Sequence, residues 1–145
     1  IFVSDKTNNI KTNNNFKPTT LKKDKEGHYI MMRRSIQQED LTILNIYALN
    51  IRAPRFIKQL LLDLRKDIDG HTIIVEDFNI PLTGLDRSLR QKTNKETLHL
   101  SWTSDQMDLI DIYRILHPIT TEYTSFSSAH GIVSKIDHVL SHKSQ

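Results

Sequence analysis

Two apolar segments with an amphipathic helix between them constrain the fold of this chain most strongly. Leu41–Ala48 and His71–Phe78 are apolar on both faces and rich in β-formers, as expected for central strands. Between them, Pro54 stands near the expected first turn of a helix and Gly70 stands where a helix commonly ends. The apolar residues of this helix recur at helical spacing: Ile57, Leu60, Leu61, Leu64 and Ile68. The strand–helix–strand order predicts an α/β fold with helices over a sheet.

Weaker patterns predict the remaining elements. Residues 95–108 are expected to be helical, and Met107–Leu116 fits either a helix or a strand. The other expected strands are Phe2–Val3, His28–Met32, Glu122–Ser127 and Ser134–Leu140, with a turn at Glu26–Gly27 and a hairpin turn at Ser128–Gly131. An Asn-rich loop is expected at about residues 7–16, and residues 1–145 are expected to form a single partial domain.

Composition limits the possible classes of protein but does not select one of them. The chain has 145 residues, a net charge of +3 and no Cys, which fits an intracellular protein and permits a polyanionic partner. No apolar stretch approaches the length of a transmembrane helix, so we expect no membrane partner. The first residue is Ile1 rather than Met, and we expect the chain to be a piece of a longer protein.

A carboxylate and an amide interrupt the second apolar strand at Asp77 and Asn79. Side chains alternate along a strand, so these two residues are expected to point the same way at the strand end. Such a pair suits phosphodiester hydrolysis, because the carboxylate can orient or deprotonate a water and the amide can donate to a phosphate oxygen. The alternative is a turn, since Asp, Asn and the following Pro81 often end a strand.

Two further residues are candidates for chemistry. Tyr47 shares a strand face with Asn45, and it is either a core tyrosine or a site residue. Asp137 lies inside an expected strand, where a carboxylate needs a partner. It either pairs with Lys135 on the same face or orients a histidine or a metal. His138 is adjacent and so faces the opposite way.

Four short segments, in this order along the chain, resemble the endonuclease/exonuclease/phosphatase family. They are Ile46–Asn50, Val75–Asn79, Glu122–Thr124 and Ser134–His138. The chain is more closely similar to the endonuclease domain of LINE-type (long interspersed element) retrotransposon polyproteins. Asp24–Met31, Ser35–Glu39, Leu85–Ser88 and Asp108–His117 carry this closer resemblance, which covers nearly the whole chain apart from the Asn-rich loop and patches near 93–106 and 127–133.

The resemblance implies a fold and an activity. The fold is a four-layer α/β sandwich, two mixed sheets flanked by helices, of which this chain would be a fragment. The activity is Mg²⁺-dependent nicking of one DNA strand, which primes a reverse transcriptase domain of the same polyprotein, in the nucleus and cytoplasm. The resemblance also implies roles for single residues: Asp77 at the attacking water and weakly at the metal, Asn79 and Tyr47 at the phosphate, Asp137 at a catalytic histidine, and Asn50, Thr124, Ser128 and His130 at the DNA.

Departures from the family pattern lead us to expect an inactive chain. Glu76 stands where the family has Gly, Leu49 where it has Pro, and Ser125 where it has an aromatic residue. The family's main metal-binding Glu and its catalytic His have no counterpart in this sequence. The alternative to a disabled nuclease is a non-catalytic remnant, which either binds nucleic acid weakly or has no function.

Overall fold

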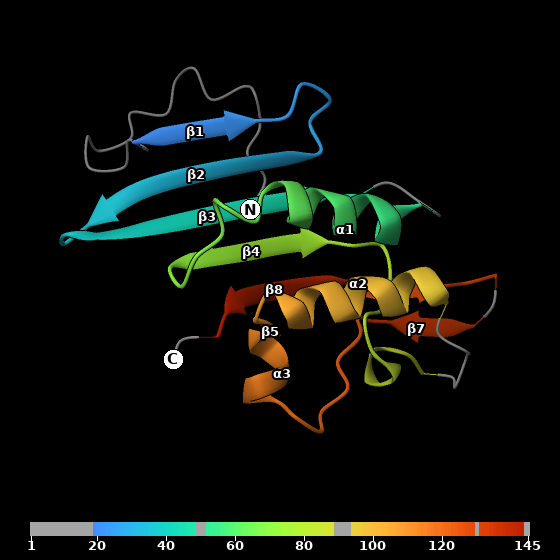
Figure 1. The fold of residues 1–145 in the computed structure, drawn as a ribbon. Coiled ribbons are helices and arrows are strands. Elements are labelled where there is room, and N and C mark those ends of the chain that lie inside the picture. The colour runs from blue at the N-terminus through green and yellow to red at the C-terminus, as the bar shows by residue number, and fades with distance from the viewer. Residues whose placement is uncertain (1–18, 49–51, 89–93, 130, 144–145) are drawn as a thin grey trace, which may run out of the picture.

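A six-stranded mixed sheet organises the molecule. The computed structural model describes residues 19–48, 52–88, 94–129 and 131–143. The strands of the sheet lie in the order β1–β2–β3–β4–β8–β5 (Figure 1). Their bounds are β1 Thr20–Lys23, β2 Tyr29–Ile36, β3 Glu39–Tyr47, β4 Thr72–Asp77, β8 Asp137–His142 and β5 Leu109–Asp111. Among the described strands, β3 and β4 are the parallel pair, and their pairing needs the helical crossover that connects them.

The two predicted central strands occupy the centre of this sheet. β3 pairs with β4 so that Thr42 lies opposite Thr72 and Tyr47 lies opposite Asp77. β2 and β3 form a hairpin whose two turn residues, Gln37 and Gln38, have φ of 51° and 72°. A two-residue hairpin favours this left-handed backbone because its twist matches that of the strands.

Helices cover one face of the sheet. α1 (Ala53–Asp63) and α2 (Lys95–Gln106) lie side by side over the sheet (Figure 1). The Asn94 side chain caps α2 by accepting a hydrogen bond from the backbone N–H of Glu96. Apolar side chains of both helices pack with those of the central strands in one core, which includes Leu44, Ile46, Ile57, Leu61, Ile74, Leu100 and Leu140.

Several boundaries differ from the sequence predictions. α1 ends at Asp63, so Gly70 does not end it; Leu64 and Ile68 stay buried in turns that follow the helix, which is why the apolar spacing continues. Met107–Leu116 contains both predicted alternatives, β5 and then the short helix α3 (Ile112–Leu116).

The segment Ser134–Leu140, predicted as the second strand of the hairpin, contributes to two separate strands. β6 (Ser125–Ser127) pairs with β7 (Ile132–Ser134), and the chain then crosses to the main sheet as β8. The described residues therefore form one six-stranded sheet and this hairpin, which is less than the two mixed sheets that the resemblance implies. Phe2–Val3 and the Asn-rich loop lie outside the described residues.

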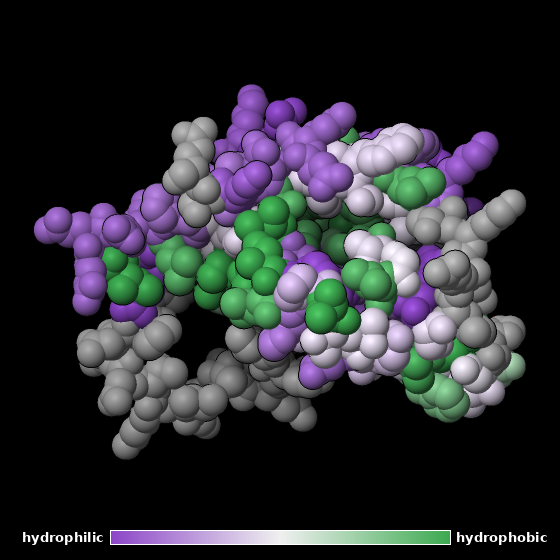
Figure 2. All heavy atoms as spheres, turned by 90° about the horizontal axis from the view of Figure 1, so that it is seen from below, coloured by the Kyte–Doolittle hydropathy of each residue, from purple (hydrophilic) through white to green (hydrophobic). Residues whose placement is uncertain are grey.

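The second face of the sheet is apolar and half-exposed. Ile30, Ile43 and Val75 alternate with core residues along β2, β3 and β4, and each is only partly buried. Exposed hydrophobic residues also gather on the side of the molecule that carries α3 (Figure 2), where Leu116 and Ile119 are exposed. None of the described helices has the length and apolar character needed to cross a membrane.

We expect the half-exposed face to bind hydrophobic dyes. Replacing Ile43 and Val75 together by Thr is expected to lower the fluorescence of bound ANS and to leave the far-UV circular dichroism unchanged. Both side chains keep their β-branched shape, and neither is fully buried. An unchanged dye signal in this double variant would contradict the assignment of the exposed face.

The matched control for this experiment is Ile74→Thr, the same change on the covered face. Ile74 is completely buried, so its hydroxyl would lose water without gaining an evident partner. We expect the free energy of unfolding of Ile74→Thr to fall by about 1–3 kcal/mol.

Candidate functional site

Three polar side chains form a row across three neighbouring strands. Tyr47 ends β3, Asp77 ends β4, and Asp137 begins β8. The register places Tyr47 opposite Asp77 and Asp77 opposite Asp137. Because neighbouring strands lie about 4.8 Å apart, the sheet brings these residues together at one end from distant parts of the sequence.

A cavity of about 560 Å³ opens along this row. Tyr47, Asp77, Asp137, Asn45 and His28 are among the residues that line it. Tyr47 keeps 44% of its surface exposed, so it is not a core tyrosine. Most of the residues that line the cavity belong to the half-exposed face of the sheet.

Asn79 does not continue the row. β4 ends at Asp77, and Asn79 has a φ of 54°, so the expectation that both side chains lie on one strand face is wrong. The Asn79 backbone N–H donates to Asp77 Oδ1 at 3.1 Å, and its side-chain amide donates to the carbonyl oxygen of Ala48 at 2.8 Å. The alternative interpretation, a turn that ends the strand, describes this local structure.

The predicted DNA-contacting residues fall in different places. Thr124 lies next to the row, where its Oγ1 accepts hydrogen bonds from the backbone N–H groups of Ile136 and Asp137 at 3.0 and 3.3 Å. Ser128 is exposed in the turn after β6. Asn50 and His130 lie outside the described residues.

Lys135 pairs with Asp111, and this corrects the alternative in which it pairs with Asp137. Lys135 Nζ lies 2.9 Å from Asp111 Oδ2 and 4.4 Å from the centre of the Tyr113 ring. His138 Nδ1 lies 3.1 Å from the same carboxylate oxygen. His138 faces away from Asp137, as strand alternation predicts, and Asp111 is the carboxylate that holds it.

Asp111 is therefore the centre of an ion cluster beneath the row. Burial favours the neutral carboxyl, but the hydrogen bonds from His138 and Lys135 outweigh burial and lower the pKa of Asp111 from its ordinary value of 3.8. The side chains of Lys135 and His138 are almost fully buried, although His138 is also one of the residues that line the cavity.

Glu76 is the least satisfied group in this region. It is 2% exposed on the covered face, directly opposite His138, and neither carboxylate oxygen has a hydrogen-bond partner among the described residues. Burial raises the pKa of Glu76 well above its ordinary value of 4.5, and the charge of Asp111 raises it further. Glu76 thus costs stability, because no hydrogen bond compensates the burial of its carboxylate.

The described residues do not fit a Mg²⁺ site held by protein alone. Asp77 and Asp137 lie opposite each other, and such like charges repel unless a cation or a proton compensates them. Mg²⁺ requires six oxygen ligands in near-octahedral geometry. Among the residues that the structure describes, no group of three or more acidic, His or Cys side chains is placed to hold a metal.

The sequence patterns did not indicate His28 as a residue of the cavity. His28 was expected only as part of a strand, yet it lies in the turn before β2 and its Nδ1 is 2.7 Å from Asp24 Oδ2. The available signal was the spacing of Asp24 and His28 around Gly27, which suits a tight turn closed by a carboxylate.

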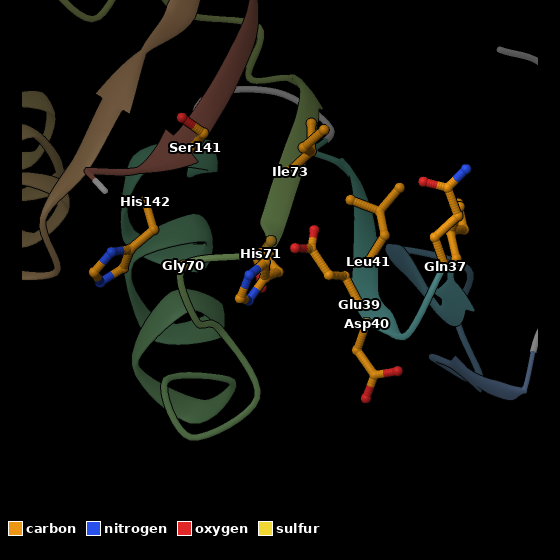
Figure 3. Close-up of a pocket in the computed structure, with 11 residues that line it drawn as sticks. Gln37, Glu39, Asp40, Leu41, Gly70, His71, Ile73, Ser141 and His142 are labelled. Carbon is orange, nitrogen blue, oxygen red and sulfur yellow. The ribbon is translucent and has the colours of Figure 1, made fainter. Parts of the chain in front are cut away.

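A second cavity lies at the opposite end of the sheet. It has a volume of about 540 Å³, and Glu39, His71 and His142 are among the side chains around it (Figure 3). β4 begins there and ends at Asp77, so the two cavities lie at opposite ends of the same strand.

The fold is similar to that of several solved structures, among them an endonuclease domain and two catalytic domains. The endonuclease domain of TRAS1, a telomere-specific non-LTR retrotransposon, matches with a TM-score of 0.59 and 11% identity, over 86% of this chain and 56% of that one. The catalytic domain of Xenopus laevis APE2 matches with a TM-score of 0.58 and 16% identity, over 81% and 46%. The human Nocturnin catalytic domain matches with a TM-score of 0.50 and 17% identity, over 79% and 41%.

These matches establish the fold alone. The chain has part of the endonuclease/exonuclease/phosphatase fold, and it spans about half the length of the structures that it matches. No protein-family model matches the chain.

Replacing Glu76 by Met is expected to stabilise the fold at neutral pH. The change removes a buried carboxylate without partners, and we expect the free energy of unfolding to rise by about 1–3 kcal/mol in urea titrations. Glu39→Met is the matched control, because Glu39 is exposed on the neighbouring strand and its loss is expected to have little effect.

The same variant tests a pH dependence. A raised pKa means that the unfolded chain loses the Glu76 proton first, so wild-type stability falls as pH rises above about 4.5 until the folded protein also ionises. Glu76→Met is expected to remove this fall. Parallel pH profiles of the wild type and the variant would show that Glu76 does not titrate abnormally.

Proposed function

We propose that this chain is part of a LINE-type retrotransposon DNA endonuclease and supplies one side of its phosphodiester-binding cleft. The row of Tyr47, Asp77 and Asp137 at one end of the sheet is the observation that carries the proposal. The fold, which the chain shares in part with the endonuclease domain of the TRAS1 retrotransposon, supports it. A reverse transcriptase domain of the parent polyprotein is the expected partner, and the nucleus and the cytoplasm are the expected locations.

Each residue of the row has a chemical task in this proposal. The Tyr47 hydroxyl is accessible and can donate to a phosphate oxygen. Asp77 can orient or deprotonate a water beside that phosphate. Thr124 fixes the backbone of Asp137, so the second carboxylate is held at the start of its strand.

We further propose that the 145-residue chain binds DNA weakly and does not cleave it. Two facing carboxylates repel a phosphate, and the described residues supply no third ligand to complete a metal site. Groups that act as a catalytic unit lose most of their rate when one member is missing. The net charge of +3 still allows weak attraction to a polyanion.

DNA binding tests the first part of this proposal. We expect the chain to bind a fluorescently labelled duplex at low salt, and Tyr47→Ala to weaken binding by roughly three- to tenfold because one phosphate contact is lost. Trp102→Ala is the matched control, since Trp102 is an exposed aromatic residue on α2, away from the row. Equal losses in both variants, or no binding by the wild type, would contradict the proposed cleft.

Plasmid nicking tests the second part. We expect no conversion of supercoiled plasmid to the nicked form by the purified chain in the presence of Mg²⁺. Asp77→Ala, prepared in parallel, reveals any contaminating nuclease. Nicking by the wild type that disappears in Asp77→Ala would show that the chain is an active enzyme.

A further inference from the structure

The turn between β1 and β2 belongs to the same end of the sheet as the row. β2 is antiparallel to β3, so β2 begins where β3 ends. The backbone N–H of Tyr47 donates to the carbonyl oxygen of His28 at 2.8 Å, which fixes this turn to the end of β3. His28 lines the cavity together with Tyr47, Asp77 and Asp137.

The imidazole of His28 is held in place from two sides. Asp24 Oδ2 lies 2.7 Å from Nδ1 and also accepts a hydrogen bond from the His28 backbone N–H at 3.2 Å. The ring packs against Phe56 with 4.9 Å between ring centres. The φ of Gly27 is +80°, a conformation that favours glycine and lets the turn close.

His28 differs from the other cavity residues because its accessible side chain can carry a positive charge. The described residues that line the cavity include no Lys and no Arg. The second histidine among them, His138, has a fully buried side chain committed to Asp111. The His28 side chain is 28% exposed, so it is the group in this lining that can present positive charge to a ligand.

We propose that His28 contacts a phosphate group of DNA bound in this cavity, and that binding requires its protonated form. In that form Nδ1–H donates to Asp24 and Nε2–H donates to a phosphate oxygen. A neutral ring that donates from Nδ1 leaves Nε2 as an acceptor, which repels phosphate. The inference rests on the proposed function, because it assumes that the ligand of the cavity is DNA.

Acidic side chains face the imidazole of His28. Asp24 at 2.7 Å and Glu26 at 3.5 Å face the ring from its own turn, while Asp77 and Asp137 line the same cavity. The hydrogen bond from His28 is the main cause that lowers the pKa of Asp24, so Asp24 stays charged as its partner. From α1, the ring meets the uncharged Phe56.

The experiment is fluorescence anisotropy of a labelled DNA duplex at low salt, at about pH 6 and about pH 8, where an imidazole changes charge. We expect the wild type to bind more tightly at the lower pH. His28→Gln is expected to weaken binding roughly tenfold at the lower pH and to remove most of the pH dependence, as for the loss of one charge-assisted hydrogen bond.

Two further variants make the result specific. His28→Lys restores a permanent positive charge, so we expect DNA binding close to that of the acidic wild type at both pH values. His71→Gln is the matched control, because His71 is exposed at the opposite end of the sheet (Figure 3), and it is expected to behave like the wild type.

The outcomes separate the two proposals. DNA binding that depends on Tyr47 but is unaltered in His28→Gln would overturn the role of His28 and leave the proposed function standing. An equal loss of pH dependence in His71→Gln would also overturn it. No DNA binding by the wild type at either pH would overturn both.

Discussion

The parallel pairing of β3 with β4 is the constraint on which the rest of the structure depends. Its register sets Tyr47 beside Asp77, and β8 adds Asp137 to the same row. Side chains alternate along each strand, so a slip of one residue would turn Asp77 into the core and Glu76 towards the cavity. Buried apolar residues in β4 and directly after it oppose such a slip, because the same shift would expose Ile74 and Phe78.

Charged side chains are compensated in different ways on the two faces of the sheet. On the covered face, Asp111 compensates Lys135 and His138, while Glu76 has no partner and is best accommodated as a neutral acid. On the cavity side, the carboxylate of Asp77 is partly exposed and that of Asp137 is exposed. The ion cluster around Asp111 is thus buried, whereas Tyr47 and Asp137 of the polar row are exposed.

Local patterns in the sequence were sufficient for β3, α1 and β4, because their apolar spacing reflects burial in the core. They also indicated Tyr47, Asp77 and Asp137 as candidate site residues, and the topology places these three side by side. They failed where distant residues decide the outcome. Asn79 leaves the strand because its amide binds Ala48 across the strand ends, and Lys135 turns to Asp111, a partner in another element.

The order of strands in the sheet also has a consequence for how the chain folds. The β2–β3 hairpin closes over two turn residues, so its contacts are local in sequence and form at little entropic cost. The pairing of β4 with β8 joins segments separated by α1, α2 and the small hairpin. Non-local pairings of this kind form slowly. We therefore expect a partly folded chain to contain the β2–β3 hairpin before Asp77 and Asp137 come together. The cavity then forms late in folding, when β8 pairs with β4.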